Sequence, residues 1–339
     1  MKQKINLKCV AEWVLYGLTL FLLLFNLSLS WNLFSARPLS DAGSYPALAR
    51  ASSFFYDTDK REPVNVFLVK MLMHLGLNDD LSVRLSTVIV MIIGGMVFLL
   101  FSVRRWGKLA GIGSTLLLVS NPWMGYYSVQ GTNNLSMGFF LVLFFFLLSL
   151  KRGLTTDILT ALAGALAVLT RLEGLAVVGL ILILDNLFHF TRPRLVSSLR
   201  IFLFLFFLVS PYLMYQWGKY GHPFQSHREH TRFWYNTRQG MLEKGDRYKG
   251  GPMSLASFFK ARGLLRSVRD MAEGYFMAFT RYMPRLFYYP VIYILFLAGV
   301  LLHLIKRKVF LLLVLLAVLF PVSFILPLDQ AVSYTHLRA

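Results

Sequence analysis

The sequence predicts an all-α fold, a multi-pass transmembrane bundle of about nine helices. Of the 339 residues, 56% are apolar and only 15% are charged, whereas a soluble domain usually carries about a quarter charged residues. The mean hydropathy is +0.58, and the apolar residues form blocks long enough to cross a bilayer, which needs roughly 20 residues. These observations exclude a soluble enzyme, a secreted disulfide scaffold and a disordered chain.

The expected spans follow the apolar blocks along the chain. They cover residues 10–30, 82–103, 109–127, 135–150, 155–171, 174–190, 199–217, 286–305 and 309–328. The first block is too long for the core of a signal peptide and has no obvious cleavage site, so we expect it to be retained. The stretch 64–77 is shorter and carries Lys70 and His74, which favours a helix lying in the membrane interface over a tenth span.

Basic residues between the spans predict the orientation. Five clusters of Lys and Arg lie near residues 2–8, 104–108, 151–152, 192–200 and 306–308. All five fall on the cytoplasmic side if the N-terminus is cytoplasmic, as the positive-inside rule requires. We therefore expect one transmembrane domain over residues 1–328, with external loops at about 31–81 and 218–285. Residues 329–339 resemble read-through sequence, and we expect them to be an artefactual tail.

The formal charge of +19 also bears on partners. The basic residues flank apolar blocks, which indicates contact with lipid phosphates and not with nucleic acid. Cys9 is the only cysteine, which excludes an internal disulfide and a cysteine-based metal site. His227-x-x-His230 could place two imidazoles on one helical face, but it lacks an obvious third ligand. A solvated face or anion contacts are the more ordinary interpretations, and no metal site is predicted.

Asp41 is the first candidate for chemistry. It stands outside the first expected span and precedes Tyr45, Leu48 and Ala49, which recur at helical spacing. A carboxylate near a helix N-terminus is stabilised by the helix dipole, so Asp41 is either an N-cap or a general base at the membrane surface. The residues alone leave both interpretations open.

Arg171 and Glu173 are the second candidates, because they lie between two apolar blocks with almost no loop. Ionisable residues in such places are costly and usually face a cavity or a partner. They are either a local ion pair that marks the turn or an arginine aimed at a lipid phosphate, for which its planar fork is suited. We favour the phosphate, since the turn is expected to face outward. Glu62 lies in a charged patch at 57–62 that we expect to be solvent-exposed.

Taken in order, these features resemble the integral-membrane glycosyltransferases of the GT-C fold that use polyprenyl-phosphate sugars, of the aminoarabinose transferase and protein O-mannosyltransferase type. The resemblance rests on Asp41 with Tyr45, Glu62-Pro63, Arg84-Leu85, Asn121-Pro122-Trp123 and Arg171. It covers roughly residues 10–235, and the order and spacing of the motifs carry it.

The resemblance implies transfer of a sugar from a polyprenyl-phosphate or dolichyl-phosphate donor to a lipid, glycan or protein acceptor, at the outer face of an inner membrane. Asp41 would be the general base of a single inverting displacement. Arg171, with Arg232 and His230 assisting, would bind the donor phosphate. The other implied substrate contacts are Tyr45, Glu62, Asn134 and Glu173.

The resemblance implies no cofactor. Family members often carry a second acidic residue, but Ala42 and Asn133-Asn134 occupy the corresponding places. These residues give no support for a divalent metal, which the family pattern otherwise allows.

Two other classes of protein stay open. A transporter or flippase would carry ionisable residues within its spans and show an internal repeat. The expected spans are almost free of charge, with Asp185 as the main exception, and no repeat is evident. A non-catalytic membrane scaffold would need Asp41 and Arg171 only for stability.

Overall fold

A computed structural model of the chain describes residues 7–39, 41–59, 61–225 and 263–326. Within these ranges the regular structure is helical and no strand occurs, which confirms the all-α prediction. The chain divides into two compact units, Met1–Gly174 with Arg192–Pro211, and Leu175–Thr191 with Tyr212–Ala339. A single transmembrane domain over residues 1–328 stays a prediction.

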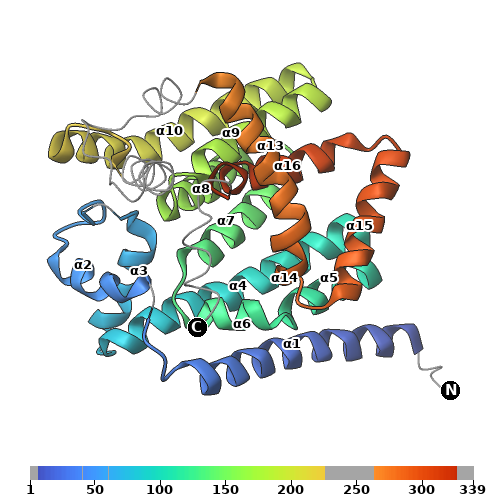
Figure 1. The fold of residues 1–339 in the computed structure, drawn as a ribbon, viewed down its shortest axis with the longest axis horizontal. Coiled ribbons are helices and arrows are strands. Elements are labelled where there is room, and N and C mark those ends of the chain that lie inside the picture. Colours follow the sequence, from blue (N-terminus) through green and yellow to red (C-terminus); the bar gives the residue numbers. More distant parts are fainter. Residues whose placement is uncertain (1–6, 40, 60, 226–262, 327–339) are drawn as a thin grey trace. The chain divides into compact units, whose positions relative to one another are not determined.

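The first unit holds most of the helices. They are α1 (Leu7–Phe34), η1 (Asp41–Ser44), α2 (Tyr45–Ala51), α3 (Pro63–His74), α4 (Asp79–Trp106), α5 (Lys108–Val119), α6 (Pro122–Val129), α7 (Asn133–Leu148), α8 (Leu154–Thr170) and the first part of α10 (Arg192–Tyr220). Figure 1 shows α1 running beside α5 and α6, and these helices are in contact.

In the part of the chain that the structure describes, three helices are long and apolar enough to cross a membrane: Glu12–Phe34 of α1, then α4 and α10. A fourth span would result if α6 and α7, which bend by 116° at their junction, were counted together. The other apolar helices are shorter, between 12 residues in α5 and 17 residues in α8. The apolar blocks thus become helices, and the count of nine spans stays a prediction.

The expected span 109–127 is broken into α5 and α6 for a local reason. Pro122 lacks the N–H that would continue α5, and its fixed φ suits the first turn of a new helix. The Asn121 side chain caps that helix by accepting a hydrogen bond from the Trp123 N–H at 3.0 Å. Asn26 of α1 closes the break, since its amide donates to the carbonyl oxygens of Val119 and Asn121, each at 2.8 Å.

The turn between α6 and α7 depends on Gly131. Its φ of +72° is a left-handed conformation that glycine adopts at little cost. A Cβ at this position would also collide with Val83 of α4 and crowd Ala42 of η1. The bend therefore forms only where the chain has no side chain.

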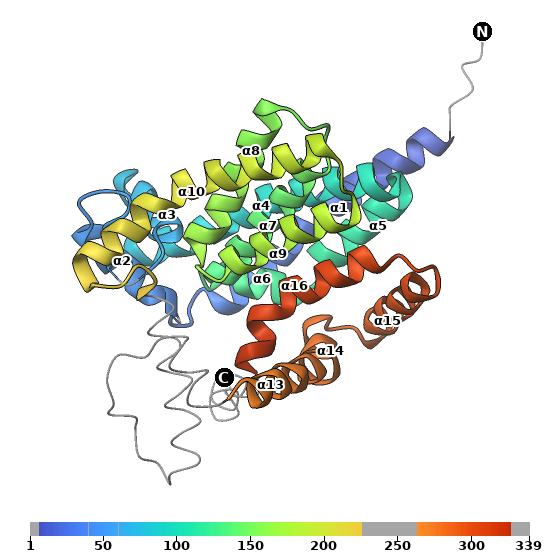
Figure 2. The same cartoon turned by 90° about the horizontal axis from the view of Figure 1, so that it is seen from above.

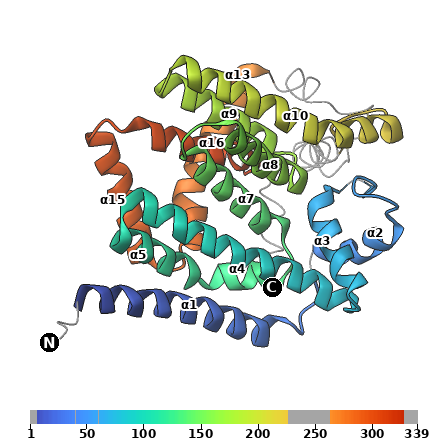
Figure 3. The ribbon, with the colours of Figure 1, turned by 180° about the vertical axis from the view of Figure 1, so that it is seen from behind.

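The buried apolar residues of the first unit gather around α4. One cluster joins α1, α4, α5 and α7 through Leu23, Leu27, Met91, Val119, Leu135 and Phe139. A second joins η1, α2, α3 and α4 through Ala42, Tyr45, Ala49, Val66, Val69 and Val83. Figure 3 shows α2 and α3 beside the beginning of α4. α3 matches the helix expected near 64–77, and its place in a membrane interface stays a prediction.

Several basic clusters of the first unit lie close to one another. Lys108 Nζ lies 2.6 Å from Glu12 Oε2 near the start of α1, and the rings of Phe101 and Phe146 bring the ends of α4 and α7 together at 6.4 Å. At the start of α8, Asp157 pairs with Arg200 of α10 at 2.6 Å. The basic clusters at 104–108, 151–152 and 192–200 therefore lie at the end of the unit where α1 begins.

The second unit holds α9 (Gly174–Phe188), the end of α10, α13 (Leu264–Met277), the π-helical turn η2 (Ala278–Tyr282), α14 (Met283–Leu286), α15 (Pro290–Ile305) and α16 (Val309–Ile325). α13 packs against α16, as Figure 2 shows. The Tyr275 hydroxyl donates to the Leu316 carbonyl at 2.8 Å and ties the two helices. The expected tail 329–339 lies outside the described residues.

Candidate functional site

Arg171 occupies the short turn between α8 and α9. The helix ends there because the Arg171 backbone is extended, with φ −154° and ψ 126°. Its Nη2 donates to Glu173 Oε1 at 3.0 Å, and its Nε donates to Oε2 at 3.4 Å. The local ion pair is therefore present, with a buried carboxylate and a guanidinium side chain that is still 21% exposed.

The same guanidinium reaches the turn between α6 and α7. Nη1 donates to Asn133 Oδ1 at 3.4 Å and also to Asn134 Oδ1. These asparagines open α7, which packs along α8. Arg171 therefore joins two turns that lie about 40 residues apart in the chain.

Glu62 adds a third segment to the site. Its Oε1 accepts the Leu172 N–H at 3.3 Å, and the residue is buried. The expected exposure of the patch 57–62 is thus wrong at Glu62. Pro63 starts α3 at this point, and the contacts of α3 with α8 bring the Glu62 carboxylate to the Leu172 N–H in the turn that follows α8.

The electrostatics of Arg171 reflect these neighbours. Burial alone lowers the pKa of Arg171, but the carboxylates of Glu173 and Glu62 and the Tyr45 hydroxyl outweigh burial and raise it. The arginine is therefore a permanent cation between two acidic side chains. We name the group Tyr45, Glu62, Asn133, Asn134, Arg171 and Glu173 the Arg171 cluster.

Five of the eight predicted site residues meet in this cluster, namely Tyr45, Glu62, Asn134, Arg171 and Glu173. Asp41 begins η1, three residues before Ser44. Ser44 is the N-cap residue of α2, and whether Asp41 is an N-cap or a general base stays a prediction. The Asp41 side chain, His230 and Arg232 lie outside what the structure describes.

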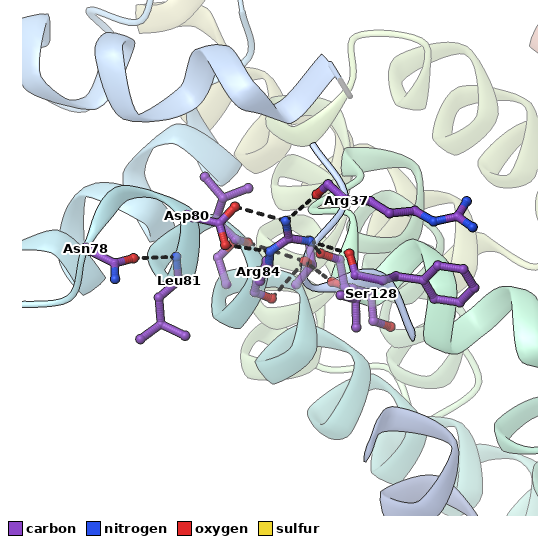
Figure 4. Close-up of polar contacts among 11 residues, drawn as sticks. Arg37, Asn78, Asp80, Leu81, Arg84 and Ser128 are labelled. Atoms are coloured by element: carbon purple, nitrogen blue, oxygen red, sulfur yellow. Dashed lines mark hydrogen bonds and ion pairs between the residues drawn. The ribbon is translucent and has the colours of Figure 1, made fainter. Parts of the chain in front are cut away.

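Arg84 anchors two of the segments that lead to the cluster (Figure 4). The side chain is 1% exposed. Nε and Nη2 donate to the two carboxylate oxygens of Asp80 at 2.7 and 2.9 Å. Nη2 also donates to the Arg37 carbonyl at 2.7 Å, four residues before Asp41.

The remaining nitrogen of Arg84 caps two helix ends. Nη1 donates to the carbonyl oxygens of Phe34 at 3.3 Å and Val129 at 3.0 Å. These carbonyls close α1 and α6 and have no partner within their own helices. From the sequence, Arg84 was identified only as a residue at the beginning of an expected span. Its role in joining helix ends was not predictable, because its partners there are main-chain carbonyl oxygens, which every residue carries.

The Arg171 cluster can exchange partners. Four hydrogen bonds occupy most of the five N–H donors of the guanidinium. A phosphate would therefore bind Arg171 by displacing the Glu173 carboxylate. Within the described ranges, no group of three or more His, Cys, Asp or Glu residues could hold a metal ion. Comparison of the chain with protein-family models, with curated proteins and with solved structures yields no match.

Proposed function

We propose that this chain is an integral-membrane glycosyltransferase that moves a sugar from a polyprenyl-phosphate donor to a lipid, glycan or protein acceptor. The observation that supports the proposal is the meeting of Tyr45, Glu62, Asn134, Arg171 and Glu173. They come from four separate parts of the chain. The sequence singled out Arg171 and Glu173 by their place between apolar blocks, and the resemblance to GT-C transferases added Tyr45, Glu62 and Asn134.

The proposed reaction is a single inverting displacement. The Asp41 carboxylate accepts the proton of the acceptor hydroxyl while that oxygen bonds to the anomeric carbon. The bond from the anomeric carbon to the phosphate oxygen breaks, and its electron pair leaves with the polyprenyl phosphate. Arg171 releases Glu173 and stabilises the departing anion, since a preorganised cation lowers the barrier where negative charge develops.

The position of three basic clusters supports an outward-facing site. The clusters at 104–108, 151–152 and 192–200 lie at the end of the first unit where α1 begins, whereas Arg84 holds the end of α1 near the Arg171 cluster. Under the positive-inside rule the cluster then faces away from the cytoplasm. This arrangement suits a bacterial inner membrane with a cytoplasmic N-terminus.

The buried acids of the helices give little support to a transporter. Asp157 pairs with Arg200 at 2.6 Å in the first turn of α8. Asp185 lies 3.4 Å from His189 near the end of α9. Both acids sit near helix ends and have local partners, whereas a transport path requires ionisable groups within the membrane core.

The proposal is tested by release of polyprenyl phosphate in proteoliposomes. Synthetic undecaprenyl-phosphate pentose and hexose serve as donors, with total bacterial lipid as acceptor, and mass spectrometry measures the products. We expect Asp41→Asn to lower the rate at least about 100-fold, as for loss of a general base. Arg171→Lys should lower it by a similar factor, because the fork geometry is lost.

Asp59→Asn is the matched control, since it makes the same change at an exposed position in the same loop and should retain the rate. Full transfer by Asp41→Asn would overturn the base assignment. If both site variants lose only stability and keep the rate, the scaffold interpretation replaces the transferase.

Glu173→Gln separates a phosphate-binding arginine from a purely structural one. The change removes the charge that competes for Arg171 but keeps the shape of the side chain. We expect tighter binding of undecaprenyl phosphate, measured by quenching of protein fluorescence in nanodiscs. Unchanged affinity would show that Arg171 does not meet the phosphate.

A further inference from the structure

Two buried polar side chains near the Arg171 cluster have no hydrogen-bond partner among the residues that the structure describes. They are Asn65 of α3, which is 2% exposed, and Ser136 of α7, which is 0% exposed. Neither the amide nitrogen nor the amide oxygen of Asn65 is bonded, and neither is the hydroxyl of Ser136. Native proteins rarely leave such groups unpaired, because each costs about 1–3 kcal/mol.

The hydrogen bonding of Ser136 also differs from that of other serine and threonine residues in the helices of this unit. The hydroxyls of Ser128, Thr160 and Thr170 each donate to the carbonyl four residues earlier in the same helix, at 2.6 to 2.7 Å. The hydroxyl of Ser136 does not take this bond, although such a bond is the ordinary choice for serine within a helix. Its direction therefore leaves it available to a group outside its own helix.

Both side chains lie one helical turn from the cluster. Asn65 lies three residues after Glu62, the N-cap residue of α3, and Ser136 lies three residues after Asn133 on one face of α7. Glu62 contacts the Leu172 N–H, and Asn133 contacts Arg171. α3 and α7 both pack against α8. The unpartnered groups thus border the cluster from two helices.

The chemistry of these groups differs from that of a phosphate site. A phosphate accepts hydrogen bonds and needs donors, whereas Asn65 and Ser136 each offer both a donor and an acceptor. Glu62 and Glu173 add acceptors and outweigh the single charge of Arg171. Groups that both donate and accept match this set, and a hydroxyl is such a group.

We propose that Asn65 and Ser136, together with Glu62, form a subsite for the hydroxyl groups of a sugar, beside the arginine that meets the phosphate. This inference rests on the proposed function, which supplies the sugar as part of the polyprenyl-phosphate donor. Its test measures binding and does not require transfer.

The first arm measures the thermal midpoint of the purified protein in nanodiscs without added sugar. Asn65→Leu should leave the midpoint unchanged or raise it, because the change removes buried groups that have no partner. Asn26→Leu is the matched control and should lower the midpoint, since the amide of Asn26 donates to two carbonyls. A fall in Asn65→Leu as large as that in Asn26→Leu would overturn the proposal.

The second arm adds methyl glycosides of a pentose and a hexose, or inorganic phosphate. We expect at least one glycoside, and not phosphate, to raise the midpoint of the unaltered protein. Asn65→Leu and Ser136→Ala should each weaken that binding about tenfold or more, the effect of one lost hydrogen bond. Ser128→Ala, which removes a buried hydroxyl that is already bonded, should bind as the unaltered protein does.

Three outcomes overturn the subsite: no glycoside response, a response that survives both substitutions, or a response to phosphate alone. The first of these means that only water meets Asn65 and Ser136. A glycoside response that depends on both residues supports the subsite even if Asp41→Asn retains transfer. Failure of the transferase and failure of the subsite are therefore distinguishable.

Discussion

Arg84 and Arg171 are two arginines of one unit with opposite surroundings. Arg84 is buried, and three of its five hydrogen bonds go to main-chain carbonyls, two of them at helix ends that cannot move without moving a helix. Arg171 is partly exposed, and all its partners are side chains. A side chain can leave its partner by changing its rotamer, whereas a main-chain carbonyl moves only with the backbone. Arg84 therefore fixes the helices in place, and Arg171 can exchange its partners.

The same substitution at three arginines tests this difference. Arg84→Met keeps the apolar stem but removes every donor, and takes its partner from the buried Val129 carbonyl at the end of α6. We expect a loss of about 3–5 kcal/mol in the free energy of unfolding, measured by denaturant titration in detergent micelles. Arg84→Lys should recover part of the loss. Unaltered stability in Arg84→Met would refute the anchoring role.

Arg171→Met should cost less, about 1–2 kcal/mol. Asn133 and Asn134 can hydrate, and the two carboxylates can take up protons once the cation is gone. The double variant Arg171→Met with Glu173→Gln should be more stable than the sum of the single changes predicts, because the pair is coupled. Additive losses in this cycle, followed by the same titration, would mean that the ion pair contributes nothing.

Arg50→Met should have the smallest effect. Arg50 Nη1 lies 2.7 Å from Asp79 Oδ1, but its side chain is 58% exposed. Exposed pairs of this kind contribute little, because water and salt replace them. We expect an unfolding midpoint within the reproducibility of the titration. A loss comparable to that of Arg171→Met would show that burial does not rank these arginines.

The sequence predicted the residues of the Arg171 cluster better than the contacts that hold them in place. Arg171 and Glu173 were visible because ionisable residues between apolar blocks are expensive and seldom accidental. Tyr45, Glu62 and Asn134 entered through the resemblance. The burial of Glu62 was not predictable, since it depends on the Leu172 N–H, 110 residues away.

The helices also show features that the sequence predicts and features that it does not. The apolar blocks predicted their existence and order, and Asn121-Pro122 already contained the signal for the break between α5 and α6. Asn65 and Ser136 gave no such signal, because a single polar residue in an apolar helix usually bonds to its own helix. Only the absence of that bond within the described part of the chain distinguishes them.

The structural constraint at Gly131 should also apply to homologues of this chain. Its left-handed backbone and its contacts with Val83 and Ala42 exclude any side chain, and the neighbouring apolar residues need only suitable volume. Across homologues we therefore expect position 131 to remain glycine while the surrounding helices diverge. An invariant glycine two residues before an asparagine pair, paired with an arginine at position 84, would reveal distant relatives that overall identity conceals.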